Sequence, residues 1–395
     1  MGEEKQILIV SGVYPPEPYV SAQMSETIAL ELSKTNKVTV LCPPVSRPIG
    51  KVQIRKIEST DNYSVVMLPS YTCPESKILG RFRESYSFGK AVAKYIYSNR
   101  NRIKVIYANT HPTFGQYLLL NEAQKYGIPV ILHVQDIYPE SLTRKLGLIG
   151  RVLEPFFVWY DRSRMKKSAK IITISPLMKK ALIESRNYQS DFVEIVYNWQ
   201  NDDIFDNVNG DRSEKFTFMF AGSLNPTASL ETVIEAFGKA NLENSQLILA
   251  GAGSDKQHCV EVAGKFKNIN IIFENITPDS VPFIQSKADV LLLPLKKGIS
   301  MTALPSKLPA YMFSSKPIIA CAETESDVAA ILTQAECGWV VEPENSEMLK
   351  QQMIKCHAMT PNDLTHFGQM GRKYAISNFS KKQNLDKICR IIRSI

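Results

Sequence analysis

The stretch FTFMFAGS at residues 216–223 indicates the fold most clearly, because it is an uninterrupted apolar run that ends in glycine and serine. A strand with one solvated face alternates apolar and polar residues, whereas a strand covered on both faces is apolar throughout. The run therefore predicts a buried strand of a parallel sheet. Helix-like segments separate it from further runs of the same kind, QLILAGAG at 246, INIIFENI at 269, DVLLLPL at 289, KPIIACA at 316 and GWVVEP at 338.

The same pattern occurs earlier in the chain, with apolar runs that begin at residues 7, 37, 64, 105, 129, 170 and 193. The polar, turn-forming segment QNDDIFDNVNGDRSEK at 200–215 separates the two series. We therefore predict a first domain at 1–199, a linker at 200–215 and a second domain at 216–379. Each domain is expected to be a doubly wound α/β domain with a Rossmann-like parallel sheet. Apolar residues at helical spacing predict a terminal helix at 380–395 that packs back on the first domain.

The composition fits two globular domains in one chain. At 395 residues the chain is too long for one ordinary core, and 44% hydrophobic with 22% charged residues is typical of folded proteins. No apolar run reaches the roughly 18 residues of a membrane span, and the start MGEEKQILIV does not resemble a signal peptide. We therefore expect a cytoplasmic protein.

Cysteine and histidine usage argues against a metal centre or a disulfide framework. The seven cysteines are scattered and never spaced as CxxC, and the five histidines form no HExxH motif. We therefore expect neither a structural nor a hydrolytic metal site.

Ligands of doubly wound sheets bind beyond the carboxyl ends of the strands, where the chain turns into a helix. Several predicted strands end in residues suited to that task, and we expect the two domains to face each other so that these ends line one cleft. The candidates are Gly12, His111, Asp136, Ser175, Asn198, Gly222, Gly251, Gly253, Pro305 and Ser306.

The motifs FAGSLN, LAGAG, ADVLLLPL and LPSKLPAYMFSSKPIIA occur in this order in the second half of the chain. Their order, with two tandem Rossmann-like domains, resembles the GT-B glycosyltransferases of family 4 over nearly the whole chain. SGVYPPE, DIYPESL, ISPLMKKAL, YNWQND and PSK resemble the branch that transfers sugars or amino sugars in colanic acid, capsule or O-antigen assembly.

The resemblance implies a nucleotide-diphosphate-sugar donor on the second domain and an acceptor on the first. It also implies retention of the anomeric configuration, with the leaving diphosphate helping to deprotonate the incoming hydroxyl. By family habit the donor is a UDP-sugar, a substrate and not a cofactor, and the acceptor is a polyprenyl-diphosphate-linked saccharide. The absence of an Asp-x-Asp motif agrees with metal independence.

The chain departs from the family pattern at the donor site. Two glutamates that the family usually carries are replaced by Thr302 and Ala310, and no arginine or lysine follows the AGS motif, where Ser223 and Asn225 stand instead. Lys307, beside Pro305 and Ser306 at the start of a predicted helix, is then the best remaining clamp for the diphosphate. A solvated surface lysine is the alternative interpretation.

Other residues have implied roles. His111 in NTHP matches a histidine that lies near the transferred sugar in the family, although a lone histidine is more often structural. Asp136 is predicted to orient the acceptor hydroxyl or accept its proton, with a helix N-cap as the alternative. Gly12 lets the backbone approach phosphate or sugar. Gly222, Gly251 and Gly253 are placed on the donor side; in the family, the loop that carries the last two borders the nucleobase.

The positive charge is concentrated in the first half of the chain. Residues 76–104 carry eight Lys or Arg against one Glu, and residues 151–170 carry six against two acidic residues, with Phe156, Phe157, Trp159 and Tyr160 among them. A solvated helix face explains the first segment. The second fits peripheral contact with the cytoplasmic face of the inner membrane, at roughly 1 kcal/mol per basic residue near anionic lipid. Nucleic acid is not expected, because no binding motif accompanies the charge.

Two other functions agree with the missing glutamates. One is a non-catalytic GT-B homologue that binds a nucleotide, a saccharide or a partner enzyme. The other is a nucleotide-sugar epimerase, for which a richer set of site carboxylates and histidines is expected.

Overall fold

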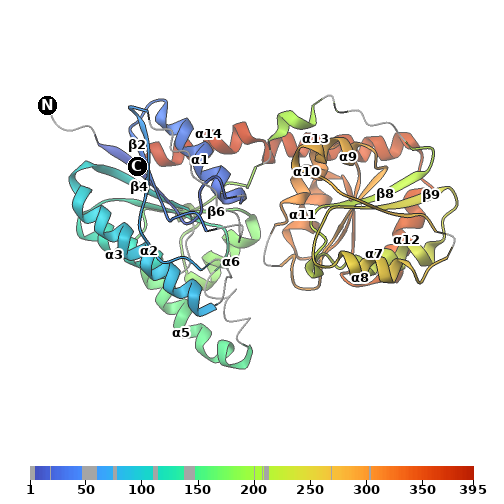
Figure 1. Cartoon of the computed structure of the whole chain (residues 1–395), viewed down its shortest axis with the longest axis horizontal. Coiled ribbons are helices and arrows are strands. Elements are labelled where there is room, and N and C mark those ends of the chain that lie inside the picture. The colour runs from blue at the N-terminus through green and yellow to red at the C-terminus, as the bar shows by residue number, and fades with distance from the viewer. Residues whose placement is uncertain are drawn as a thin grey trace. The chain divides into compact units, whose positions relative to one another are not determined.

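The structure is a computed structural model, and it describes residues 5–17, 19–46, 60–73, 78–109, 114–137, 147–199, 201–206, 208, 213–267, 269–301 and 304–395. The chain forms two compact units (Figure 1). Unit 1 consists of Met1–Val196 and Leu385–Ile395, and unit 2 consists of Tyr197–Asn384. Each unit is built on one parallel sheet with helices on both faces, so the prediction of two Rossmann-like doubly wound sheets is confirmed.

Unit 1 contains a seven-stranded sheet in the order β3-β2-β1-β4-β5-β6-β7. The winding direction reverses between the two central strands β1 and β4, which pair in parallel up to Ser11 and Asn109. This reversal creates the switch point at which ligands of such sheets bind. The strands are β1 (Gln6–Ser11), β2 (Val38–Cys42), β3 (Tyr63–Met67), β4 (Ile103–Asn109), β5 (Val130–Val134), β6 (Lys170–Thr173) and β7 (Val193–Ile195).

Helices cover both faces of the unit 1 sheet. On one face α2 and α3 pack so closely that a Cβ on Gly89 would lie 2.3 Å from the Cα atom of Gly115 (Figure 1). On the other face α14 lies beside α1, and the Arg393 guanidinium donates to the Glu31 carbonyl oxygen at 3.4 Å. The helices are α1 (Val20–Ser33), α2 (Ile78–Asn99), α3 (Phe114–Lys125), α5 (Gly147–Met165), α6 (Pro176–Arg186) and α14 (Lys381–Arg393).

A buried ion pair ties three helices of unit 1 together. The Arg186 guanidinium of α6 donates to the Asp161 carboxylate of α5 at 2.8 Å, and the Tyr117 hydroxyl of α3 donates to the other Asp161 oxygen at 2.9 Å. The Arg186 side chain is fully buried and that of Asp161 nearly so. Because water cannot solvate these charges, each depends on the other.

Unit 2 contains a six-stranded sheet in the order β10-β9-β8-β11-β12-β13, with its switch point between β8 and β11. Phe205, in the segment predicted to be a linker, is buried and stacks on Phe313 of this unit at 5.8 Å between ring centroids. The strands are β8 (Phe216–Ala221), β9 (Ser245–Ala250), β10 (Ile271–Glu274), β11 (Val290–Pro294), β12 (Ile318–Cys321) and β13 (Gly338–Val341).

Two apolar cores lie on the two faces of the unit 2 sheet, one under α9, α10, α11 and α13 and the other under α7, α8 and α12 (Figure 1). Among the described residues of the whole chain, no helix is both long enough and apolar enough to span a bilayer. The helices of unit 2 are α7 (Leu230–Ala240), α8 (Lys256–Ala263), α9 (Val281–Ser286), α10 (Lys307–Phe313), α11 (Asp327–Ala335), α12 (Ser346–His357) and α13 (Pro361–Phe379).

Candidate active site

Tyr311 lies between β8 and β11 at the switch point of unit 2. Strands β8 and β11 pair only at Phe218 and Met219, so Ala221, the last residue of β8, lies beyond the β8–β11 ladder. The Ala221 N–H donates to the Tyr311 hydroxyl at 2.9 Å, and this hydroxyl donates to the Ala221 carbonyl oxygen at 3.0 Å. The side chain thus takes the place of a neighbouring strand and fixes α10 against the end of β8.

Lys307, the first residue of α10, reaches across this point and does not extend into bulk water. Its ammonium nitrogen lies 5.3 Å from the centroid of the Phe220 ring, and its side chain runs along the backbone of Gly222. Partial burial lowers the pKa of the Lys307 ammonium, and no charged group within the described residues offsets this effect. A partly desolvated cation without a counter-ion is well suited to bind an anion.

Three glycines shape the floor of the same site. A Cβ on Gly251 would lie 1.8 Å from the Gly222 carbonyl oxygen, and a Cβ on Gly253 would lie 1.9 Å from the Leu224 carbonyl oxygen. The turns after β8 and β9 can therefore pack together only because these positions lack side chains. At Gly222, the Lys307 side chain occupies the space that a Cβ atom would fill.

We expect Gly222→Ala to displace the Lys307 ammonium. The new Cβ would lie 2.0 Å from Cε and 3.1 Å from Nζ of Lys307, and the flexible end of that side chain can move away. A shift of about 1 Å should lower the affinity for UDP about tenfold, measured by isothermal titration calorimetry. The control is Gly127→Ala in unit 1, where φ is also positive at +64° but no atom lies within 4 Å of the new Cβ. It should leave UDP binding unchanged, and an equal loss in both variants would contradict the expectation.

The other predicted site residues of unit 2 lie around this site and differ in their exposure to solvent. Ser223 and Gly253 are exposed, whereas Pro305 is half-buried and Ser306 is exposed just before α10. The Asn225 side chain accepts hydrogen bonds from the N–H and hydroxyl of Thr227 at 3.0 and 2.5 Å, so it caps the short 3-10 turn Pro226–Ala228.

Of the two positions where the family usually carries a glutamate, the structure describes one. Thr302 lies outside the described residues. Ala310 is 8% exposed and belongs to the apolar core, so this position offers no polar contact to a ligand. Since α10 has only seven residues, its dipole adds little to the Lys307 charge.

Glu323, which was not among the predicted site residues, holds the loop after β11 in place. Its carboxylate accepts the Gly298 N–H at 2.5 Å and the Ser300 hydroxyl, and the Glu323 N–H donates back to that hydroxyl at 3.1 Å. Burial raises the pKa of the Glu323 carboxyl, but these hydrogen bonds outweigh burial and the net pKa is lowered. The charged carboxylate therefore stabilises the loop that leads to Lys307. The only feature of the sequence that could have indicated this role is the position of Glu323 two residues after the buried strand β12.

In unit 1, the structure places Gly12 directly after β1 and Asp136 two residues after β5, both partly buried at the carboxyl edge of the sheet. His111 lies outside the described residues. Ser175 is the N-cap of α6, because its hydroxyl accepts the Met178 N–H at 3.2 Å. Ser175 therefore has a structural role as a helix cap.

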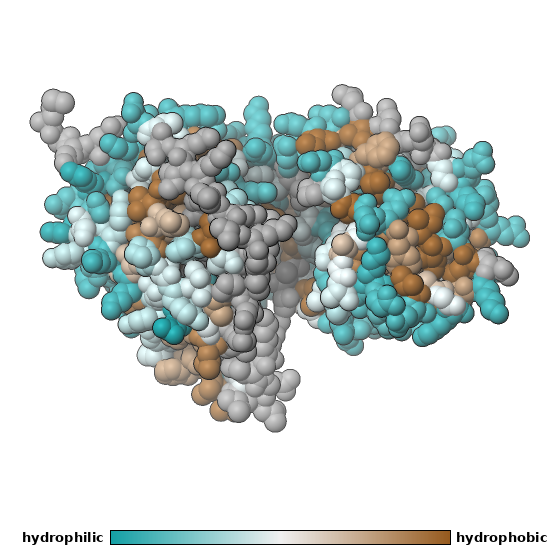
Figure 2. Space-filling view, viewed as in Figure 1, coloured by the Kyte–Doolittle hydropathy of each residue, from teal (hydrophilic) through white to brown (hydrophobic). Residues whose placement is uncertain are grey.

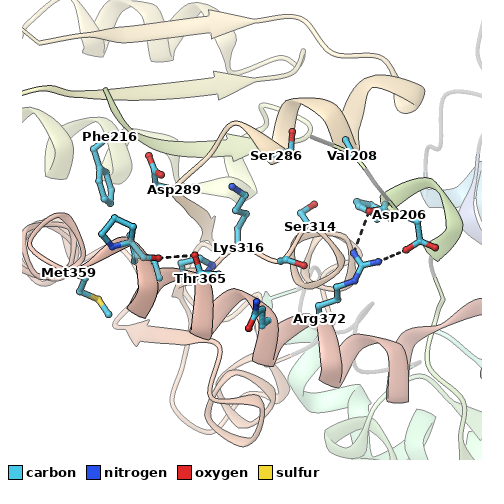
Figure 3. A pocket seen from close by; sticks show the side chains of 16 residues that line it. Asp206, Val208, Phe216, Ser286, Asp289, Ser314, Lys316, Met359, Thr365 and Arg372 are labelled. Carbon is cyan, nitrogen blue, oxygen red and sulfur yellow. Dashed lines mark hydrogen bonds and ion pairs between the residues drawn. The ribbon is translucent and has the colours of Figure 1, made fainter. Parts of the chain in front are cut away.

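A separate cavity of about 850 Å³ opens at the opposite edge of the unit 2 sheet (Figure 3). It is lined by Phe216 at the start of β8 and by Asp289 and Lys316, which precede β11 and β12. Arg372 closes one end, where it donates to the Phe313 carbonyl oxygen at 2.6 Å and pairs with Asp206. None of the predicted site residues lines this cavity, and it lies at the amino ends of the strands, away from the switch point.

Comparison with known families agrees with this geometry in both units. Residues 23–203 match the family described as Glycosyltransferase Family 4, and residues 201–374 match the family described as Glycosyl transferases group 1. The chain therefore belongs to the family 4 glycosyltransferases, and its two Rossmann-like sheets are those of the GT-B fold.

Two relatives are similar in sequence over most of their length. The probable glycosyltransferase WbjE of Pseudomonas aeruginosa is 22% identical over 75% of this chain and 76% of its own. The putative colanic acid biosynthesis glycosyl transferase WcaI of Escherichia coli K12 is 24% identical over 69% of each chain.

Solved structures share the fold at lower identity. A glycosyltransferase from Rickettsia africae is 15% identical with a TM-score of 0.70, over 99% of this chain and 98% of that one. Anabaena HepE, solved in complex with UDP, is 14% identical with a TM-score of 0.67, over 99% of this chain and 100% of that one. WaaG, a glycosyltransferase involved in lipopolysaccharide biosynthesis, is 16% identical with a TM-score of 0.65, over 98% and 99% of the two chains.

Proposed function

We propose that the protein transfers a hexosyl-type sugar from a UDP-sugar to a polyprenyl-diphosphate-linked saccharide, with retention of configuration and without a metal ion or other cofactor. The product would serve the assembly of a surface polysaccharide such as capsule or O-antigen. The observation that carries this proposal is the partly buried Lys307 ammonium at the switch point of unit 2, which has no counter-ion among the described residues. The UDP complex of the structural neighbour HepE and the name of WcaI support the donor and the pathway.

In this proposal, unit 2 stabilises the leaving group. Negative charge develops on the diphosphate as the bond to the sugar breaks, and Lys307 would bind it while Gly222 lets the backbone approach closely. Tyr311 and Glu323 would act as positioning residues, because they hold α10 and the loop after β11. Ser223, Asn225, Gly251, Gly253, Pro305 and Ser306 complete the proposed donor side.

Unit 1 would bind the acceptor through the carboxyl ends of its central strands. Gly12 would allow close approach of the saccharide, and Asp136 would orient the attacking hydroxyl. The leaving diphosphate would take the proton of that hydroxyl on the same face of the sugar, which accounts for retention. His111 is proposed to lie near the transferred sugar.

UDP release decides between this function and the alternatives. The purified protein is incubated with a panel of UDP-sugars, with and without the lipid-linked saccharide fraction extracted from membranes of the source organism. Release that depends on the extract supports transfer. Conversion of one UDP-sugar into another without extract would indicate an epimerase, and UDP binding without any release would indicate a binding protein.

We also propose that α5 places unit 1 on the cytoplasmic face of the inner membrane. Trp159, Phe156, Val152 and Leu153 lie at helical spacing, and they are 61%, 60%, 78% and 41% exposed, respectively. Figure 2 shows apolar atoms at the lower end of unit 1, where α5 lies in Figure 1. The last turn of α5 carries Arg162, so apolar and cationic side chains occur together, as in membrane-surface helices.

Vesicle sedimentation tests the membrane contact. Replacing Phe156 and Trp159 by Ser should reduce binding to vesicles of phosphatidylethanolamine and phosphatidylglycerol about tenfold or more, because each ring would lose apolar burial. Tyr97→Ser on α2 is the control, since that ring is 54% exposed but is already covered by Arg100 at 5.0 Å. Equal binding by all three proteins would contradict the proposed contact.

A further inference from the structure

A network of buried and partly buried hydrogen bonds joins the ends of three strands in unit 1. The Gln135 side chain, just after β5, donates to the Asn109 side-chain oxygen at 2.9 Å. Asn109, the last residue of β4, donates to the Ser25 hydroxyl at 2.9 Å and to the Ser21 carbonyl oxygen at 3.0 Å. The Ser25 hydroxyl lies 2.9 Å from the hydroxyl of Ser11, the last residue of β1.

Asn109 is the centre of this network, and three hydrogen bonds hold its side chain in place. Its side chain accepts one hydrogen bond and donates two, and the residue is 3% exposed. Ser25 and Ser11 are 0% and 1% exposed, and the Ser11 hydroxyl also donates to the Val13 carbonyl oxygen at 2.6 Å. Buried networks in which each member is satisfied hold a single geometry, because every alternative leaves a polar group without a partner.

The residues of this hydrogen-bond network stand one or two positions before the candidate residues of the acceptor side. Gly12 follows Ser11, Asp136 follows Gln135, and His111 comes two residues after Asn109. The network also fixes the first turns of α1 through Ser21 and Ser25. It therefore links the carboxyl ends of β1, β4 and β5, which these candidate residues follow.

We propose that Asn109 is a positioning residue that locks the ends of β1, β4 and β5 into one register for the acceptor. The proposal rests on the proposed transferase function and assigns no contact between Asn109 and a substrate. Loss of the network frees the three strand ends from one another, and the acceptor hydroxyl is then held in a range of positions relative to the donor.

The test compares Asn109→Ala and Asn109→Asp with a matched control on the same sheet. The control is Thr39→Val, because Thr39 is also buried, donates to Gln6 at 2.7 Å and lies 3.0 Å from the Ser64 hydroxyl, at the amino ends of the strands and away from their carboxyl ends. Asn109→Ala and Thr39→Val should lower the melting temperature to a similar extent. UDP binding, measured by calorimetry, should stay unchanged in all variants, since its proposed site is in unit 2.

Transfer with the extracted lipid-linked saccharide fraction should separate the variants. We expect kcat to fall about 100-fold in Asn109→Ala, less in Asn109→Asp, which keeps the acceptor for Gln135, and at most about twofold in Thr39→Val. The KM for the UDP-sugar should stay the same. A fall in kcat that follows melting temperature alone, equal in Asn109→Ala and Thr39→Val, would overturn the positioning role.

Hydrogen exchange supplies a readout that does not need the acceptor. In the full-length protein, Asn109→Ala should accelerate amide exchange in residues 12–17 and 134–137 together, and Thr39→Val should accelerate neither. Acceleration confined to β4 would overturn the proposal even where transfer occurs. If Asn109→Ala accelerates exchange in both segments but the unmodified protein shows no transfer with any UDP-sugar, the role of the network in joining the strand ends is supported. The proposed transferase function is then refuted.

Discussion

Lys307→Ala should lower the affinity for UDP by about 30- to 150-fold. An ammonium about 4 Å from a phosphate has a raw Coulomb attraction of about 4 kcal/mol at an effective dielectric of about 20, part of which is offset by desolvation of the phosphate. A net loss of about 2 to 3 kcal/mol corresponds to the stated range. Calorimetric titration with UDP measures it, and kcat/KM for the UDP-sugar should fall at least as far because charge grows on the leaving group.

Lys297→Ala is the matched control for this substitution. Lys297 lies in the loop between β11 and α10 and is exposed, so its removal should change UDP affinity by less than about twofold. Because burial lowers the pKa of Lys307, UDP affinity of the unmodified protein should weaken as the pH rises through that lowered pKa. Lys307→Met should lose this pH dependence. A Lys307 variant that binds UDP normally would exclude the lysine from the donor site.

Asp161→Ala should lower the free energy of unfolding by about 3 to 5 kcal/mol, because it removes the carboxylate that pairs with the fully buried Arg186 guanidinium. The Tyr117 hydroxyl loses its acceptor in the same variant. Urea denaturation followed by circular dichroism measures the effect. Unit 1 should lose stability, and helix α5 should lose the polar contacts of Asp161 with α3 and α6.

Two controls separate the buried ion pair from helix surface effects. Glu184→Ala removes an exposed pair with Lys180 at 4.0 Å and should change stability by less than about 0.5 kcal/mol. The double substitution Asp161→Leu with Arg186→Met replaces both charges by apolar groups, and it should recover most of the lost stability. A double variant as unstable as Asp161→Ala would mean that packing around α5, and not the loss of the ion pair, explains the lower stability.

The sequence predicted the sheets well because strands buried on both faces leave a continuous apolar signal. FTFMFAGS contains β8, the runs that begin at residues 289 and 316 contain β11 and β12, and the run that begins at 246 contains all of β9 except its first residue. Tandem apolar runs cannot indicate how long each strand is, and β7 contains only Val193–Ile195 of a longer apolar run.

The site was harder to predict, because its geometry depends on contacts between distant segments. Lys307 could be selected from its place before a helix, but its contact with Gly222 and Phe220 required the fold. Tyr311 bonds to Ala221, 90 residues away, and replaces a strand partner that sequence patterns would assume to be present. The Asn109 network was missed for the same reason, since its members are single polar residues at the ends of apolar runs.

A crystal structure of the protein with UDP would show whether Lys307 binds the diphosphate. We expect the diphosphate to lie at the carboxyl ends of β8 and β11, with the Lys307 ammonium within hydrogen-bonding distance of a phosphate oxygen. A diphosphate bound elsewhere, or a Lys307 side chain turned away from it, would exclude Lys307 as the diphosphate clamp.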